Sequence, residues 1–347
     1  TDLKSYRRTE LDRLIRDYRG MVYHSKYVFN FIHKKHCSEI DQITTVSKEI
    51  REKLKTDGFF ISDLELVESF ADNDGTVKFL FEAGDGARFE SVVMDEAGRK
   101  TVCVSCQSGC RMGCLFCATG KMGFKRNLTA GEIVEQVYTT VKALGRVDNV
   151  VYMGMGEPFD NYEPVLDSID ILRDQEGMNI GQRHITVSTC GISEKIAEFG
   201  DYNGQVRLAV SLHGASDEVR REIMPAAKGQ DLKQIVSALS DYQKRSGRRF
   251  TVEYCMIADV NDSPDQAAGL VHLLKGLKYN VNLIEYNPHP GSNLSASSRS
   301  DIERFAGVLR TKGIETIIRY KRGENINAAC GQLGADSLKM KDIKKDE

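Results

Sequence analysis

Five of the nine cysteines in the chain crowd into one short segment, 103-CVSCQSGCRMGCLFC-117. Two glycines, Gly109 and Gly113, and several small polar residues separate them, and this composition predicts a loop. Thiols at such density can form a disulfide knot, a zinc site or an iron–sulfur cluster. The chemistry of the chain therefore depends first on which of the three this loop makes.

The length and the composition of the chain argue against the disulfide knot. Nine is an odd number of cysteines, and 347 residues supply a core large enough to need no covalent staples. No run of about 18 apolar residues predicts a membrane span. The charged segment 1-TDLKSYRRTELDRLIRDYRG-20 lacks the apolar stretch of a signal peptide. We therefore expect a cytoplasmic protein with no membrane partner, in which clustered thiols more often bind metals or act in catalysis.

The dense core of the loop is the spacing Cys110-x3-Cys114-x2-Cys117. Three thiolates can hold three corners of a [4Fe–4S] cube, whereas a cluster used only for electron transfer normally takes four. A structural zinc ion also requires four ligands, and Cys103 or Cys106 is available as the fourth. Zinc sites usually pair two distant knuckles, however, and no second knuckle follows downstream. The spacing favours a cluster with one open iron, and a zinc site stays as the alternative.

The elements that must position this loop change character along the chain. Residues 1 to about 70 carry apolar side chains at helical spacing. The pattern then alternates as in strands. Three strands are predicted before the cysteine loop: 76–83 and 87–96, which form a hairpin, and 101–105.

Strand and helix patterns alternate after the loop. The segment Thr129-Ala-Gly-Glu132 predicts a capping box that opens a helix. Apolar, β-branched strands separated by amphipathic helices indicate a parallel sheet with right-handed crossovers. The predicted strands are 148–155, 184–190, 206–213, 250–257, 280–287 and 315–320. We therefore predict an α/β fold, a partial (β/α)6 barrel with a β-hairpin extension and a small N-terminal helical domain.

These patterns divide the chain into four predicted parts. They are a helical accessory domain at 1–72, a β-hairpin linker region at 73–100, the barrel with the cysteine loop at 101–333, and a disordered tail at 334–347. In barrels of parallel strands, the site lies at the carboxyl ends of the strands. The polar residues that fall at such ends are Glu157, Ser188, Ser211, His213 and Asn287. We expect them to lie at the site.

Further motifs resemble one family of enzymes. The spacing Cys-x3-Cys-x-Phe-Cys early in a (β/α) chain is similar to the signature of radical S-adenosylmethionine (SAM) enzymes. Segments between residues 87 and 333 resemble those of the RlmN/Cfr family of radical SAM adenosine methyltransferases: 103-CVSCQSGC-110, 116-FCATGKMGFKRNL-128, 153-MGMGEP-158, 211-SLH-213 and 328-AACGQL-333. The segment 286-YNPHPGS-292 is more similar to the RlmN branch.

The resemblance implies a role for each matching residue. Cys110, Cys114 and Cys117 would ligate one [4Fe–4S] cluster. Cys330 would accept a methyl group, with Cys103 as its disulfide partner. Glu90 would act as an acid/base, although its place in an alternating strand also fits an outward-facing residue. The residues that would bind SAM are Gly156, Glu157, Ser188, Ser211, Leu212, His213 and Asn287.

The reaction that the resemblance implies is methylation of C2 of an adenosine in 23S rRNA, and of a tRNA adenosine beside the anticodon. Two SAM molecules would be consumed, one to methylate Cys330 and one to supply the radical that activates this methyl group. A flavodoxin or ferredoxin would donate the electron, and the rRNA would be a protein-poor assembly intermediate. Two alternatives stay open: Cfr-type methylation at C8 of the same adenosine, and a zinc-dependent RNA-binding protein without catalysis.

The charge of the chain limits how RNA would bind. The net charge is −2, so binding would have to use local basic patches. The candidate patches are the series Arg7, Arg8, Arg13, Arg16 and Arg19, the turn 121–126, and the segment 244–249.

The cysteines outside the matched positions carry less information. Cys106 stands where the family usually has serine, and a thiol there is either neutral or competes with Cys103 in thiol exchange. Lone buried cysteines usually behave as small hydrophobic residues. We interpret Cys37, Cys190 and Cys255 in this way.

Overall fold

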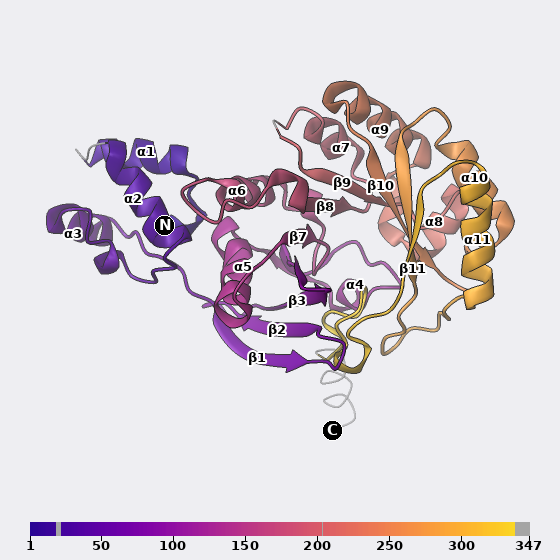
Figure 1. Cartoon of the computed structure of the whole chain (residues 1–347), viewed down its shortest axis with the longest axis horizontal. Coiled ribbons are helices and arrows are strands. Elements are labelled where there is room, and N and C mark those ends of the chain that lie inside the picture. Colours follow the sequence, from indigo (N-terminus) through magenta and orange to yellow (C-terminus); the bar gives the residue numbers. More distant parts are fainter. Residues whose placement is uncertain (19–21, 203, 337–347) are drawn as a thin grey trace.

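The computed structural model describes residues 1–18, 22–202 and 204–336. A group of N-terminal helices lies beside a larger α/β body (Figure 1). Arg19 and residues 337–347 of the predicted tail lie outside the described residues. None of the described helices is long and apolar enough to cross a membrane.

A ten-stranded sheet forms the body, in the order β1-β2-β3-β4-β7-β8-β9-β10-β11-β12. The first four strands pair antiparallel, and every pair from β4 to β12 is parallel. Strands β1 and β12 are the two edges, so the described sheet is open and does not close into a barrel. The strands are β1 (Glu65–Ala71), β2 (Val77–Glu82), β3 (Arg88–Glu96), β4 (Arg99–Cys103), β7 (Asn149–Tyr152), β8 (Ile185–Thr189), β9 (Arg207–Ser211), β10 (Phe250–Met256), β11 (Tyr279–Glu285) and β12 (Thr316–Arg319).

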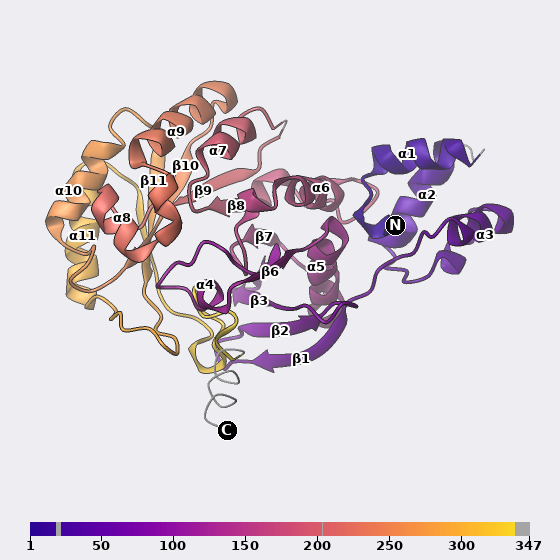
Figure 2. The same cartoon turned by 180° about the vertical axis from the view of Figure 1, so that it is seen from behind.

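Helices cover the outer side of the curved parallel strands (Figures 1 and 2). Most of them bury an apolar stripe at helical spacing, as Ile235 and Leu239 do in α9. A large core lies between these helices and the sheet, and a smaller cluster that includes Ile223 of α8 is separate from it. The helices of the body are α4 (Ala118–Met122), α5 (Ala130–Leu144), α6 (Tyr162–Arg173), α7 (Ser193–Phe199), α8 (Asp217–Ile223), α9 (Leu232–Ser246), α10 (Pro264–Leu273) and α11 (Arg299–Thr311).

The predicted elements of the body are confirmed. Strands β2 to β4 match the three strands expected before the cysteine loop, and β7 to β12 match the six expected after it. The capping box of α5 is also formed. The Glu132 N–H donates to Thr129 Oγ1 at 3.1 Å, and the Thr129 N–H donates to Glu132 Oε2 at 2.9 Å.

The predicted helical region ends too late, because β1 is a strand. It pairs antiparallel with β2 through its backbone. As an edge strand, it leaves nearly all of its side chains exposed. No alternation of buried and exposed residues was therefore required of its sequence, and no strand pattern was visible.

The N-terminal helices are joined to the body through a buried ion pair. Lys4 Nζ lies 2.6 Å from Glu135 Oε2 of α5, and both side chains are almost fully buried. Nearby, His33 Nδ1 lies 2.7 Å from Tyr138 Oη. The helices are α1 (Arg8–Asp17), α2 (Val22–His33) and α3 (Lys48–Thr56). The predicted domain boundaries stay a prediction.

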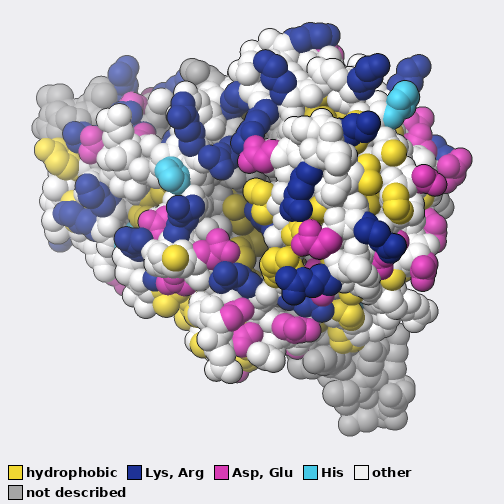
Figure 3. All heavy atoms as spheres, turned by 45° about the vertical axis from the view of Figure 1, so that its right-hand side comes forward, with side chains coloured by type: hydrophobic (Ala, Val, Ile, Leu, Met, Phe, Trp, Pro, Cys, Tyr) yellow, Lys and Arg dark blue, Asp and Glu magenta, His cyan; other side chains and the backbone are white. Residues whose placement is uncertain are grey.

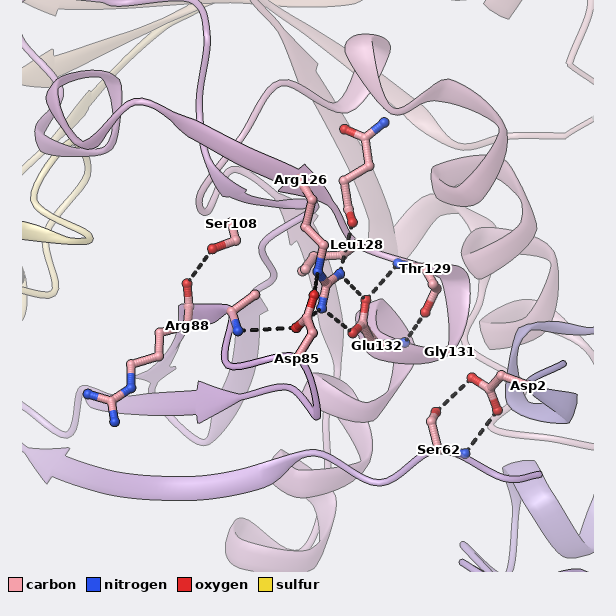
Figure 4. A network of polar contacts seen from close by, with 12 residues as sticks. Asp2, Ser62, Asp85, Arg88, Ser108, Arg126, Leu128, Thr129, Gly131 and Glu132 are labelled. Atoms are coloured by element: carbon pink, nitrogen blue, oxygen red, sulfur yellow. Dashed lines mark hydrogen bonds and ion pairs between the residues drawn. The ribbon is translucent and has the colours of Figure 1, made fainter.

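Two short strands, β5 (Gln107–Gly109) and β6 (Phe124–Asn127), frame the cysteine loop. Arg126 of β6 forms ion pairs with Asp85 at 2.6 Å and Glu132 at 2.7 Å (Figure 4). It therefore ties the loop to the β2–β3 turn and to the start of α5. This guanidinium belongs to one of the expected RNA-binding patches, but it already has two acidic partners.

Candidate active site

A cavity of about 170 Å³ opens at the carboxyl ends of the parallel strands. The cysteine loop, the strand ends and the segment after β12 all contribute to its lining. The predicted residues that line it are Cys110, Cys114, Cys117, Gly156, Glu157, Ser188, Ser211, His213 and Cys330. The predicted residues that do not line it are Leu212, Asn287, Cys103 and Glu90. The fold thus brings most of the expected site together from distant parts of the chain.

The three loop thiols of Cys110, Cys114 and Cys117 are free. Local backbone hydrogen bonds shape the loop: the Cys110 N–H donates to the Gly123 carbonyl at 3.2 Å, and the Cys117 N–H donates to the Cys114 carbonyl at 3.2 Å. Burial raises the pKa of the Cys110 thiol to about 12, and Cys117 nearby also raises it. Metal binding requires thiolates, so the charge of bound iron would have to offset this cost.

The donor set fits a [4Fe–4S] cluster with one open corner. Within the described ranges, no three His, Cys, Asp or Glu side chains converge on a point that a single metal ion could occupy. The three thiols instead lie around a cavity. Three thiols around one cavity match the three corners of a [4Fe–4S] cluster that cysteines would hold, with one iron left open.

The turn after β7 places Gly156 and Glu157 at the cavity. Gly156 has a φ of +100°, and a Cβ there would lie 2.5 Å from the Gln107 side chain, so only glycine fits. Glu157 is buried, and its carboxylate accepts hydrogen bonds from the Phe159 N–H at 2.9 Å and the Cys190 N–H at 2.7 Å. Burial raises its pKa and these donors lower it. The side chains of Thr189 and Cys190 also donate hydrogen bonds to this carboxylate and lower its pKa.

His213 is held in its neutral form at the end of β9. Its Nδ1 accepts a hydrogen bond from the Cys255 N–H at 2.9 Å, and its ring meets Phe116 edge-on at 4.6 Å between centroids. Burial, helped by the nearby Arg220, lowers the pKa of His213 to about 3. The ring therefore carries its proton on Nε2, where it can donate to a ligand without adding charge.

Arg220 of α8 is a fully buried cation that the sequence did not single out. Its guanidinium donates to the carbonyls of Ser211 at 3.1 Å, Leu212, and Cys190 at 3.0 Å. It thereby fixes the ends of β8 and β9 beneath the cavity. The burial of Arg220 could not be predicted from the sequence. The residue lies in a charged helix, 217-DEVRREI-223, and this pattern predicts exposure to solvent.

Two cysteines that we interpreted as inert also line the cavity, namely Cys190 and Cys255. Burial raises the pKa of both thiols. Their positions follow from the strands that carry them, since each lies at the carboxyl end of a parallel strand or just after it. Cys37 lies elsewhere, in the core beneath the N-terminal helices.

Cys330 is held at the cavity by its neighbours in the chain. The Gly331 carbonyl accepts from the Ala118 N–H at 2.7 Å, and Asn287 Nδ2 donates to the Cys330 carbonyl at 3.1 Å. Gly331 has a φ of +85°, and a Cβ there would lie 2.8 Å from the Phe116 carbonyl, so glycine permits this close backbone approach. Asn287 thus supports Cys330. Its Oδ1 is buried and has no partner among the described residues, so it stays available to a ligand.

Cys103 lies at the end of β4, close to Cys330. Burial raises the pKa of the Cys103 thiol, and the nearby Cys330 raises it further. The surrounding protein also raises the pKa of Cys330, although this residue is exposed at the cavity, and Arg319 opposes the effect. All nine cysteines lie in the described part of the chain and all are free, so the expected disulfide is not a feature of this structure.

Glu90 lies on β3 and supports the segment that carries Cys330. Its carboxylate accepts from the Gly334 N–H at 3.0 Å and lies 3.8 Å from Lys78 Nζ, which pairs with Asp336 at 2.7 Å. Glu90 is 4% exposed, so the outward-facing interpretation is wrong. The expected disordered tail also begins too early, because residues 334–336 are fixed by these contacts.

Cys106 is buried, as Cys103 is, and the thiol that acts on its pKa is that of Cys110. Cys106 is 1% exposed, and its thiol contacts the Met155 carbonyl at 3.7 Å. It does not line the cavity. This position agrees with the neutral interpretation of the serine-to-cysteine difference.

Comparison with known proteins identifies the family. Residues 104–271 match the Radical SAM superfamily, and residues 1–58 match the ribosomal RNA large subunit methyltransferase N-terminal domain. A probable dual-specificity RNA methyltransferase RlmN from Staphylococcus saprophyticus is 44% identical, over 92% of this chain and 88% of its own length. Its counterpart from Staphylococcus aureus is also 44% identical, over 90% and 87%. The chain belongs to the RlmN family.

The fold agrees with membership of the RlmN family. The crystal structure of a radical SAM methyltransferase from Sphaerobacter thermophilus matches with a TM-score of 0.89 and 41% identity, over 96% of this chain and 99% of that chain. The open α/β sheet is therefore a radical SAM fold of the methyltransferase type. The resemblance to the RlmN/Cfr family is confirmed, and membership implies a [4Fe–4S] cluster and SAM as cofactors.

Proposed function

We propose that this enzyme methylates C2 of an adenosine in 23S rRNA, and of a tRNA adenosine beside the anticodon, with Cys330 as the methyl carrier. One observation carries the proposal: Cys330 lines the same cavity as Cys110, Cys114 and Cys117. A thiol that carries a methyl group must meet both SAM and the cluster site, and this cavity offers both. The names of the RlmN relatives, which specify dual-specificity RNA methyltransferases, support the substrate class.

Different residues of the cavity would bind the cluster and SAM. Cys110, Cys114 and Cys117 would hold the cluster, which when bound supplies the reductive cleavage of SAM characteristic of this superfamily. Glu157 would accept hydrogen bonds from the SAM ammonium group. The groups that would orient the rest of SAM are Gly156, Ser188, Ser211, the Leu212 backbone, His213 and the Asn287 Oδ1 atom.

Two thiols would carry out the methyl transfer. The Cys330 thiol takes a methyl group from one SAM by displacement. A hydrogen atom would pass from this methyl group to the fragment released from a second SAM, and the carbon would then bond to the adenine ring, with loss of one electron from the adduct. Cys103 would remove the ring proton and bond to the Cys330 sulfur as the carbon–sulfur bond breaks and the freed carbon takes up a proton. The methylated base would then leave, and an external reductant would have to reduce the Cys103–Cys330 disulfide before the next turnover. Covalent catalysis of this kind divides a difficult step into feasible ones. Glu90 would position Cys330 through Gly334.

The cluster assignment predicts a loss of iron on replacement of Cys114. Anaerobically purified wild-type protein should contain about four irons and four sulfides per chain, and Cys114→Ala should lose most of both because only two thiolates remain. Cys37→Ala, a cysteine buried far from the cavity lining, is the control and should keep its iron. About one zinc and no iron in the wild type would instead favour the zinc-dependent RNA-binding alternative.

The position of methylation is tested on RNA. A strain that lacks its own enzyme is complemented with this gene, and nucleosides from its 23S rRNA and tRNA are analysed by mass spectrometry. We expect 2-methyladenosine in both, and none when the gene carries Cys330→Ala. A C8-methylated product without a C2 product would refute the proposal and favour the Cfr-type reaction.

A further inference from the structure

A second and larger cavity, of about 1330 Å³, lies within the curve of the parallel strands. Every strand from β7 to β12 contributes to its wall. Its charged lining is strongly positive, with six arginines against two glutamates: Arg173, Arg183, Arg207, Arg248, Arg249 and Arg319, with Glu253 and Glu315. Figure 3 shows Lys and Arg side chains on both sides of a hollow in one face of the molecule. Such a lining suits a ligand that carries several negative charges, such as an RNA backbone.

Some of this positive charge is not neutralised within the protein. Arg249 pairs with Glu315 at 2.6 Å, and Arg173 pairs with Asp170 at 3.0 Å. Arg207 and Arg319, by contrast, form no ion pair among the described residues, although the charge of Arg319 acts on Glu253. Their guanidinium groups are therefore available for phosphate oxygens.

The two cavities meet at Met153 and Glu253, which line both. The alternation of β10 explains this arrangement, because every second side chain of a strand points to the same face. Along β10, Thr251 lines the large cavity, Glu253 lines both, and Cys255 lines the small one. Glu253 therefore lies between the arginines and the cavity of Cys330.

Glu253 is built as a hydrogen-bond acceptor that lacks one partner. It is 3% exposed, and its Oε1 accepts from Asn282 Nδ2 at 2.8 Å. Its Oε2 is buried and has no hydrogen-bond partner among the described residues. Burial raises the pKa of this carboxyl, and Arg319 and Asn282 oppose the shift. Buried polar atoms are rarely left unpaired, so an orphan acceptor at the junction of two cavities points to a ligand donor.

We propose that the target nucleotide enters through the arginine-lined cavity and that Glu253 Oε2 accepts a hydrogen bond from the exocyclic amino group of its adenine. This inference rests on the proposed function. The arginines would hold the RNA backbone, and the unstacked base would pass inward past Glu253 to Cys330. The base is the part of the substrate that must enter as far as Glu253. Its exocyclic amino group is the donor that can supply the missing hydrogen bond to the Oε2 atom. Glu253 is then a specificity-determining residue.

Base discrimination tests this role. RNA hairpins that carry either adenosine or purine ribonucleoside, which lacks the amino group, are offered to the wild type and to Glu253→Met. A hydrogen bond to a charged acceptor corresponds to about a 10- to 100-fold preference, so the variant should lose about that much of the adenosine-to-purine ratio of kcat/KM. Glu253→Gln keeps one carbonyl acceptor and should retain part of the ratio. Glu315→Met, in the same cavity but paired with Arg249, should leave the ratio unchanged.

The results of these assays distinguish a role for Glu253 in base recognition from a structural role and from a role in SAM binding. A merely structural Glu253 would lower kcat/KM for both hairpins equally and leave the ratio unchanged, which would refute the inference. Slower methylation of Cys330 by SAM in Glu253→Met, followed by intact mass, would show that the carboxylate serves SAM instead. If the wild type methylates neither hairpin nor native RNA, the proposed function fails, and this inference fails with it.

Equilibrium binding of the adenosine hairpin tests the route independently of catalysis. Arg207→Gln should weaken binding and lower the slope of log Kd against log salt concentration by about one, because one phosphate contact is lost. Arg304→Gln, on the outer helix α11, is the control and should change neither quantity. An unchanged slope in Arg207→Gln would place the RNA on another face and refute entry through this cavity.

Discussion

Replacement of Cys330 by alanine is expected to abolish RNA methylation, with a fall of at least about 10⁴-fold in rate, because the methyl group would have no carrier. The wild-type protein should also show, in its intact mass, the increment of one methyl group after incubation with SAM. Cys330→Ala should not show it. The cluster cysteines are untouched by this change, so the iron content should stay at the wild-type level.

The matched control is Cys255→Ala, because Cys255 is a second thiol that lines the same cavity. This variant should still gain the methyl group and still methylate RNA. A methyl group that persists in Cys330→Ala and disappears in Cys255→Ala would assign the carrier role to Cys255 and contradict the proposed mechanism.

Replacement of Cys103 by alanine is expected to trap the RNA on the protein. Cys330 can still be methylated and can still bond to the base, but no neighbouring thiol removes the ring proton or displaces the Cys330 sulfur. Release of methylated RNA should fall at least about 100-fold, in line with the loss of a general base. The measurement is a denaturing gel of protein incubated with SAM, a reductant and labelled RNA, in which the RNA should migrate with the protein.

Two further variants serve as controls for the trapping of RNA by Cys103→Ala. Cys106→Ser restores the residue usual in the family at a position outside the cavity lining, and it should release product as the wild type does. Cys103→Ala combined with Cys330→Ala should form no covalent product. Normal release by Cys103→Ala, together with trapping by Cys106→Ser, would mean that Cys106 is the resolving thiol.

Local sequence patterns were sufficient to predict most of the body. The parallel strands pack one face against the helices, so their inward residues must be apolar, and this pattern could be recognised in the sequence. The capping box at Thr129 and Glu132 is an interaction between residues three apart, so it is encoded locally. The edge strand β1 carries no such requirement, since its side chains are exposed. Its place in the sheet is decided by backbone pairing with β2.

Charged residues in the interior were the main failure of sequence reasoning. Glu253 stands in an otherwise apolar strand, 250-FTVEYCM-256, and this contrast was the available signal. The burial of Arg220 could not be predicted, because the carbonyl groups that accept its hydrogen bonds lie at the ends of two strands and are not marked by any residue type in the sequence. Glu90 shows the reverse case. The sequence placed it on a strand, but its contact with Gly334 determines that it supports Cys330.

The sequence by itself determined the strands of the α/β body and their parallel arrangement, the three closely spaced thiols of the cluster loop and the family to which the chain belongs. All of these depend on residue type and on short spacings, which local chemistry constrains. Only the tertiary structure decided that Cys190 and Cys255 line the same cavity as Cys330, and that Glu253 lies between this cavity and an arginine-lined one. These relations join residues far apart in the chain, and such contacts are set by how the strands and helices pack.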